Sequence, residues 1–223
     1  MKKKVLVIGA NGFTGRRILN DLSRNDEYIV TGCSLHDDIA PDSGNYRFIS
    51  ADICQMGEQS ALFREVRPNI VINTSALSVP DYCEAHRDEA DSVNAVGQLA
   101  FRCEASAARF IHLSTDFVFN GDTGQLYTEE DTPDPVNYYG ATKLKGEKRV
   151  AELCSNYAIA RVVVVYGAAL PGQHGNILQL VANRLRNNEE IRVVSDQWRT
   201  PTYVGDVSQG IEKLINHHNN GIY

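Results

Sequence analysis

A tyrosine and a lysine four residues apart carry the clearest chemical signal in the sequence. They begin and end the stretch Tyr139-Gly140-Ala141-Thr142-Lys143. Side chains at positions i and i+4 of a helix point from one face, so a helix here brings the phenol and the ammonium together. An adjacent ammonium favours the phenolate, and the pair predicts that Lys143 lowers the pKa of Tyr139 toward neutral pH. Tyr139 is then a candidate general acid for protonating an alkoxide.

Two hydroxyl side chains and a carboxylate lie where they can share a site with this pair. Ser114, Thr115 and Asp116 follow the apolar run Phe110–Leu113. If that run is a strand, these side chains lie at its carboxyl end, where doubly wound sheets bind ligands. A lone Tyr-x-x-x-Lys pair is common on protein surfaces. The strand end before it, and a glycine motif 130 residues before Tyr139, favour a catalytic role.

The glycine motif predicts a phosphate-binding turn. Gly9, Gly12 and Gly15 stand between the apolar run Val5–Ile8 and a helical pattern. Glycines there permit a tight turn and a close approach of a diphosphate, and the helix N-terminus offers free amides. The alternative is a purely structural turn. We expect cofactor contacts from Gly9, Asn11, Gly12, Phe13, Thr14 and Gly15.

Two further strand ends bear on the cofactor. The stretch Cys33–His36 carries no acid that would hold a ribose 2′-hydroxyl, although Asp37 and Asp38 follow closely. This weakly favours NADPH over NADH, with Ser34 as a contact to a 2′-phosphate. His36 is another candidate, or simply a residue of a surface loop. Asp52 and Ile53 are candidate adenine contacts; the alternative for Asp52 is a helix cap.

The order of apolar runs predicts a doubly wound α/β fold. Strand-like runs alternate with helical patterns, which is typical of a parallel sheet covered on both faces. We expect a Rossmann domain over residues 1–166. The expected strands are Val5–Ile8, Tyr28–Cys33, Arg47–Ile49, Ile70–Ile72, Phe110–Leu113 and Ile159–Tyr166, and the later helices are Gln59–Val66, Glu89–Arg109 and Tyr139–Cys154.

The pattern changes after Tyr166, and residues 167–223 read as a small, partial substrate lobe. The final residues Ile222-Tyr223 resemble the start of a strand. We therefore expect the chain to stop within a domain and to lack a C-terminal part. The expected elements of the lobe are a loop at Ala168–Gly175, a helix at Ile177–Arg186, a strand at Ile191–Val194 and a helix at Gly205–Asn216.

Composition narrows the classes of function. The chain has 223 residues and a net charge of −6, which argues against a general binder of nucleic acid or anionic membranes. It has no apolar window of about 18 residues and no signal-peptide core. The five cysteines are scattered and odd in number, which predicts reduced thiols in a cytoplasmic protein with no metal site.

With these motifs, the sequence resembles the extended short-chain dehydrogenases/reductases, and within them the dTDP-4-dehydrorhamnose reductase (RmlD-like) family. The resemblance covers essentially the whole chain. Its most specific piece is the stretch from Ser114 to Gly121. The other matched pieces are Gly9–Gly15, Asn73–Ala76, Val93–Ala95, Tyr127 with Glu129 and Asp131, Tyr139–Lys143 with Gly146-Glu147, and Asp196-Gln197 with Pro201-Thr202.

The resemblance implies residue roles. Thr115 would bind the substrate carbonyl, with Ser114 as the less favoured candidate; Tyr139 would donate the proton, and Lys143 would bind the nicotinamide ribose. Further cofactor contacts would come from Thr74, Ser75, Ala76, Ser78 and Tyr166. Residues facing a nucleotide-sugar substrate would be Asp116, Phe117, Asn176, Gln197, Arg199 and Thr202.

The implied activity is reduction of the C4 ketone of a nucleotide-linked 4-keto-6-deoxy sugar by NADPH or NADH. Phe117 departs from the family, which commonly has tyrosine there. The alternatives are another nucleotide-sugar reductase or epimerase, and a regulatory subunit like that of methionine adenosyltransferase.

Several residues have two interpretations. Asn94 either orders the site or packs helices together. Trp198 and Arg199 either bind a base and a phosphate or belong to a packed loop. The turn Glu129–Asp131 is an exposed acidic turn or a cation site between subunits. His217-His218 reads as a solvated helix end. The helices from Glu89 and Tyr139 could form a homodimer contact.

Overall fold

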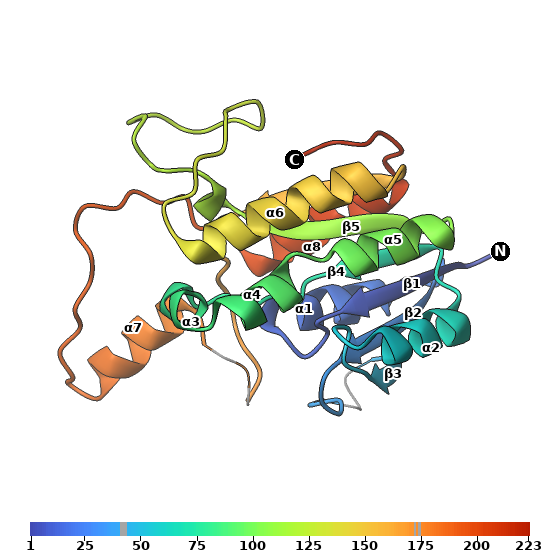
Figure 1. Ribbon diagram of the computed structural model, residues 1–223. Coiled ribbons are helices and arrows are strands. Elements are labelled where there is room, and N and C mark those ends of the chain that lie inside the picture. Colours follow the sequence, from blue (N-terminus) through green and yellow to red (C-terminus); the bar gives the residue numbers. More distant parts are fainter. Residues whose placement is uncertain (41–43, 172, 174) are drawn as a thin grey trace.

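The computed structural model describes residues 1–40, 44–171, 173 and 175–223. It has a six-stranded sheet between two layers of helices (Figure 1). Every pairing within the sheet is parallel. The elements are β1 Lys3–Ile8, α1 Phe13–Leu22, β2 Tyr28–Ser34, β3 Arg47–Ser50, α2 Met56–Val66, β4 Ile70–Asn73, α3 Pro80–Ala85, α4 Arg87–Asn94, α5 Gly97–Ala105, β5 Arg109–Thr115, the 3₁₀ turn η1 Asp116–Val118, α6 Tyr138–Leu153, β6 Tyr157–Val162, α7 Ile177–Arg186 and α8 Val204–Asn216.

The core forms on both faces of the sheet because the central strands are apolar at successive positions. Val5 and Val7 of β1 pack with residues of α1 and α8. Leu6 and Ile8 point to the other face and pack with residues of α2, α5 and α6. Side chains alternate across a strand, so a continuous apolar run buries both faces. The predicted doubly wound fold is confirmed.

The strand order β3-β2-β1-β4-β5-β6 places the chain reversal between β1 and β4. The carboxyl ends of parallel strands meet at one edge of the sheet, and ligands of this fold bind at the reversal point. The glycine loop after β1, the Thr74 segment after β4 and the Thr115 segment after β5 therefore converge. This convergence brings the predicted site residues to one edge.

Three predicted elements differ from the structure. The single helix predicted over Glu89–Arg109 is two helices, because Val96 between α4 and α5 has a left-handed backbone with φ of 41°. The strand predicted to reach Tyr166 ends at Val162, and Val164 has φ of 36°. No strand forms at Ile191–Val194, where the chain lies exposed without pairing to a neighbouring strand.

The predicted start of a strand at the end of the chain is supported by pairing. Ile222 forms a parallel bridge with Ile159 of β6, and the amide of Tyr223 donates to the Ile159 carbonyl over 2.8 Å. All five cysteines are free thiols. Among the described residues, no helix has the length and apolar character needed to cross a bilayer. The predicted loop at Ala168–Gly175 contains residues 172 and 174, which lie outside the described residues.

Candidate functional site

The glycine loop leaves room and hydrogen-bond donors for a phosphate group. Gly9 has a backbone φ of 79°, a left-handed conformation that favours glycine. A Cβ on Gly15 would overlap the carbonyl oxygen of Gly9. Helix α1 begins at Phe13, and no side chain caps its N-terminus. The amides of its first turn are therefore open to an anion, which fits the diphosphate of a dinucleotide.

Asn11 and Ser34 tie this loop to the end of β2. The amide of Asn11 donates to Ser34 Oγ over 2.9 Å, and Asn11 Nδ2 donates to the carbonyls of His36 and Asp37. The side-chain amide of Asn11 therefore already has hydrogen-bond partners within the protein. Ser34 Oγ accepts from the Asn11 amide, so its hydroxyl hydrogen can still be donated, and the contact with a 2′-phosphate stays a prediction.

Arg16 and Asp38 form a buried ion pair beside this loop that the sequence analysis missed. Arg16 also donates to Tyr46 Oη over 2.6 Å. Burial alone would raise the pKa of Asp38, but hydrogen bonds from the Ala40 amide and from Arg16 hold that pKa below its usual value. The sequence did contain a signal for this ion pair, because Arg16 directly follows Gly15 and falls on the buried face of α1.

Asp52 and Ile53 lie after β3, as predicted. Asp52 Oδ1 accepts from the Cys54 amide over 2.9 Å, whereas Gln55 is the N-cap of α2. The interpretation of Asp52 as a helix cap is therefore wrong. The carboxylate stabilises a local turn after β3, and the adenine contact stays a prediction.

The segment after β4 lies against the glycine loop. Thr74 Oγ1 donates to the Ile8 carbonyl over 2.8 Å, and a Cβ on Gly9 would come within 2.7 Å of the Ser75 amide nitrogen. Buried Asn94 accepts from the Leu77 amide and donates to the Leu77 carbonyl, over 2.9 and 3.0 Å. Asn94 therefore orders the loop that carries Thr74, Ser75, Ala76 and Ser78, and it also packs helices by donating to Thr142.

Tyr139 lies beside Thr115 at the end of β5, and the Thr115 hydroxyl donates to Asp116 Oδ1 over 3.2 Å. Tyr139 lies in the first turn of α6, which Asn137 caps by accepting from the Gly140 amide. Burial raises the pKa of Tyr139 to about 12, and the hydrogen bond with Thr115 opposes that rise. The prediction that Lys143 lowers this pKa is wrong here, because desolvation dominates. The phenol therefore stays protonated at neutral pH.

Lys143 faces strand β5. Its Nζ donates to the Leu113 carbonyl over 2.6 Å and lies 3.4 Å from His112 Nε2. The side chain is buried, and burial lowers the pKa of Lys143 to about 8 while the charge of Glu147 opposes the shift. The helix thus brings Tyr139 and Lys143 to one face, as predicted, but the ammonium is directed to the strand.

Ser114 faces a buried ion pair that the sequence analysis also missed. Its hydroxyl donates to Glu147, and Arg161 donates to both carboxylate oxygens of Glu147 over 3.0 and 2.7 Å. The Arg161 guanidinium lies over the Phe119 ring, 5.0 Å from its centroid. The adjacent hydroxyls of Ser114 and Thr115 thus have different partners, and Thr115 is the one next to Tyr139.

Four of the residues predicted to face the substrate are joined through Arg199. Arg199 forms an ion pair with Asp116, and its guanidinium carbon lies 4.2 Å from the centroid of the Phe117 ring. Phe117 in turn meets Tyr139 edge to face, with ring centroids 5.6 Å apart. The loop after α7 is therefore held next to the Tyr139 site. Gln197 Oε1 accepts from Arg199 over 3.5 Å.

The remaining predicted residues take backbone or capping roles. Asn176 caps α7 in a capping box and donates to the Gly167 carbonyl over 2.7 Å. Tyr166 donates its amide to the Thr202 carbonyl over 3.0 Å. Trp198 is 97% exposed, so it does not belong to a packed loop. Arg199 of this loop is held in place by its ion pair with Asp116.

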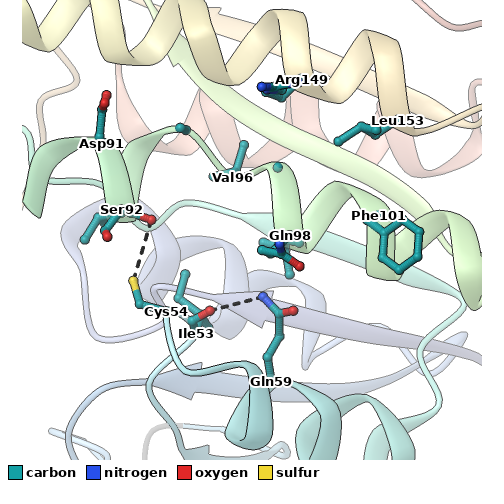
Figure 2. Close-up of a pocket in the computed structure, with 14 residues that line it drawn as sticks. Ile53, Cys54, Gln59, Asp91, Ser92, Val96, Gln98, Phe101, Arg149 and Leu153 are labelled. Atoms are coloured by element: carbon teal, nitrogen blue, oxygen red, sulfur yellow. Dashed lines mark hydrogen bonds between the residues drawn. The ribbon is translucent and has the colours of Figure 1, made fainter. Parts of the chain in front are cut away.

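A separate hollow of about 640 Å³ lies between α2, α5 and α6, away from Tyr139. Figure 2 shows Ile53 and Cys54 at one side of it, with the Cys54 thiol directed to the Ser92 carbonyl, 3.7 Å away. Ile53 is the one predicted cofactor residue in its lining. Within the described ranges, no group of three or more histidine, cysteine or acidic side chains could hold a metal ion. His217, His218, Glu129 and Glu130 are exposed.

Residues 2–223 match the family described as "RmlD substrate binding domain". The spore coat polysaccharide biosynthesis protein SpsK of Bacillus subtilis (strain 168) is 30% identical over 221 residues, which cover 96% of this chain and 70% of that protein. Methionine adenosyltransferase 2 subunit beta of Bos taurus is 31% identical over 214 residues, which cover 95% of this chain and 62% of that protein.

A solved structure has the same fold. It is the dTDP-4-dehydrorhamnose reductase from Bacillus anthracis strain Ames in complex with NADP. The TM-score is 0.83 and the identity 31%, over 100% of this chain and 74% of that one. This chain therefore spans between about three fifths and three quarters of the length of these three proteins.

Proposed function

Because the chain belongs to the RmlD substrate binding domain family, we propose that it is an NAD(P)H-dependent reductase of a nucleotide-linked sugar ketone. The observation that carries this proposal is the placement of Tyr139 beside Thr115 at the carboxyl end of β5, on the same edge of the sheet as the glycine loop. A protonated phenol and a second hydroxyl can both hydrogen-bond one carbonyl oxygen. Such a pair suits an oxygen that gains negative charge.

The cofactor would lie across the edge of the sheet. Its diphosphate would meet the open amides of α1, and its adenosine the Ser34 and Asp52–Ile53 segments. The segment Thr74–Ser78, Tyr166 and Lys143 would hold the nicotinamide nucleotide. When bound, reduced nicotinamide supplies a hydride to a carbonyl carbon. The preference for NADPH remains our proposal, based on the missing acid at the end of β2.

The chain's own residues would position the ketone and complete the reduction. Thr115 and Tyr139 would donate hydrogen bonds to the ketone oxygen. As the carbonyl carbon gains hydrogen with its electron pair, the C=O π bond breaks and its electrons move to oxygen. Tyr139 would then give its proton to that oxygen, forming an alcohol and leaving a phenolate. Solvent would return a proton to Tyr139.

We assign the substrate to nucleotide-linked 4-keto-6-deoxy sugars reduced at C4. Arg199, held by Asp116 and Phe117, is suited to pair with a diphosphate. Phe117 offers an aromatic face beside Tyr139. Gln197 and Thr202 lie on the loop that carries Arg199, and Asn176 lies at the start of α7. We also propose that the protein is cytoplasmic and forms a homodimer. The chain spans only part of its relatives' length, so the substrate, the location and the homodimer are all proposed for it here.

A second candidate is a cofactor-binding subunit without turnover. It is favoured by the 31% identity to a subunit of methionine adenosyltransferase. It is also favoured by the orientation of Lys143, whose ammonium points to the Leu113 carbonyl and not to the Tyr139 hydroxyl. A third is an epimerase or another nucleotide-sugar reductase. The test is NADPH and NADH oxidation with dTDP-4-keto-6-deoxy-L-mannose, followed by product stereochemistry. Cofactor binding with no oxidation would favour the subunit.

A further inference from the structure

His112 lies wholly buried between the β4 strand end and the candidate catalytic helix. Its Nδ1 is 3.2 Å from Asn73 Nδ2, and its Nε2 is 3.4 Å from Lys143 Nζ. The ring thus connects a residue of β4 to a residue of α6. Figure 1 shows β5, which carries His112, running beneath α6.

The orientation of the Asn73 amide is fixed by the chain that follows it. Asn73 Oδ1 accepts from the Ser75 amide over 3.2 Å and from the Ser75 hydroxyl over 2.6 Å. The oxygen is therefore on the Ser75 side, and the NH₂ group faces His112. Since an NH₂ group only donates, His112 Nδ1 accepts and carries no proton.

The proton of the neutral ring must then be on Nε2. Burial, followed by the nearby charge of Lys143, holds the pKa of His112 well below its usual value, so the ring has one N–H group. That group points at Lys143 Nζ. A protonated Lys143 thus faces a donor on this side and has the Leu113 carbonyl as its acceptor, 2.6 Å away.

The other ionisable groups around Lys143 have partners or stay neutral. Glu147 of α6 is the opposing charge, and it is already paired with Arg161 of β6 and Ser114 of β5. Tyr139 of α6 is protonated, as is the buried Cys83 of α3, whose pKa is raised by burial. Further out, Asp116 pairs with Arg199, Asp91 of α4 with Lys145, and Arg102 of α5 with Gln59.

We propose that His112 is a positioning residue that controls the protonation of Lys143: Asn73 fixes its tautomer, and the resulting Nε2–H group gives the lysine no acceptor. The inference rests on the proposed function for its consequence. A lysine short of acceptors gains them when ribose hydroxyls of a dinucleotide arrive, so cofactor binding takes up a proton. Affinity for NADPH then falls as the pH rises past the midpoint of Lys143.

The test is nuclear magnetic resonance on the cofactor-free protein. The ¹⁵N shifts of the His112 ring identify the protonated nitrogen, and the ¹³Cε shift of Lys143 reports its titration midpoint. We expect a bare Nδ1 and a protonated Nε2. The variant H112Q, which offers an amide oxygen near the Nε2 position, raises the Lys143 midpoint by about one pH unit or more.

Two variants separate this effect from disturbed packing. H112F keeps a ring but offers no acceptor, and I111V weakens the same strand beside His112; both leave the midpoint closer to the wild-type value than H112Q does. A proton on Nδ1 in the wild type, or an unmoved midpoint in H112Q, overturns the proposal. These readouts need no turnover, so a failed reductase assay would refute the proposed function and leave this inference standing.

Discussion

The Tyr139 phenol lies beside the Thr115 hydroxyl at the carboxyl end of β5, where both residues are buried and hydrogen bonding by Thr115 favours the phenolate. Burial raises the pKa of Tyr139 to about 12 against that effect. The phenol is consequently a proton donor across the neutral range. Tyr139 and the open amides of α1 lie at the same edge of the sheet, so one bound dinucleotide could reach both.

Replacing Tyr139 by phenylalanine should lower kcat on the order of 10²–10⁴-fold, which is the usual contribution of a positioned acid. The affinity for NADPH, measured by fluorescence titration, should change little. Tyr138→Phe is the matched control, because that neighbouring ring lies under Arg87 at 4.7 Å. Equal losses in both variants would contradict the assignment.

Thr115→Val and Ser114→Ala should separate the two adjacent hydroxyls. Thr115→Val removes a hydrogen bond to the reacting oxygen and should lower kcat about 10²-fold with the fold intact. Ser114→Ala removes a bond to buried Glu147 and should lower unfolding stability by about 1–3 kcal/mol, with a smaller effect on kcat. Urea denaturation and steady-state kinetics measure both. The reverse pattern would make Ser114 the substrate contact.

Gly15→Ala should impair dinucleotide binding. The added methyl group would overlap the Gly9 carbonyl oxygen and push the phosphate turn away from its position. We expect the Kd for NADPH to rise at least about tenfold, corresponding to roughly 1.4 kcal/mol. Gly57→Ala, in the first turn of α2 with no atom within 4 Å of the new Cβ, should leave the Kd unchanged. An unchanged Kd for Gly15→Ala would exclude this loop as the phosphate site.

Arg199→Met should raise the KM for the nucleotide sugar about tenfold or more, since it removes a charge suited to a diphosphate. The Kd for NADPH should stay constant. Arg192→Met is the control on the same loop, because Arg192 is exposed and lies 3.8 Å from exposed Glu190. An unchanged KM would place the substrate phosphates elsewhere.

The buried Lys143 should make stability depend on pH. Its pKa falls from 10.5 to about 8 on folding, so the unfolded chain binds the proton more tightly. Stability contributed by this group therefore rises with pH between about 8 and 10.5 and is lowest below 8. Lys143→Met should raise unfolding free energy at neutral pH by at most about 3 kcal/mol.

Urea denaturation of Lys143→Met and wild type at several pH values measures this difference. The gain should shrink toward about pH 10. The exposed Lys145→Met, whose lysine pairs with Asp91 at the surface, should show no such dependence. A gain that is independent of pH would mean that packing, and not the lysine charge, explains it.

The positions of the main site residues were predictable because they follow strand ends. Apolar runs fixed β1, β4 and β5, and parallel strands bring their carboxyl ends together. Gly9, Thr74 and Thr115 therefore had to lie along the same edge of the sheet. The face shared by Tyr139 and Lys143 followed from helical spacing. The ion pair between Arg199 and Asp116 was not predicted, although the family resemblance had placed both residues among those that face the substrate.

Long-range contacts and backbone strain were not predictable. The break at Val96 requires a left-handed valine, which no local preference favours. The pKa of Tyr139 depends on burial, and spacing from Lys143 alone gave the wrong direction. The ion pairs Arg16–Asp38 and Glu147–Arg161 join residues 22 and 14 positions apart, and periodicity does not report such pairs.

The central claim is that Tyr139 protonates a sugar ketone as it is reduced. Its most direct test is NADPH oxidation with dTDP-4-keto-6-deoxy-L-mannose, using the wild-type protein and its Tyr139→Phe variant. The account predicts one NADPH oxidised for each C4 alcohol formed, and loss of that turnover in the variant. Oxidation that continues in the variant, or NADPH binding without any oxidation in the wild type, would contradict it.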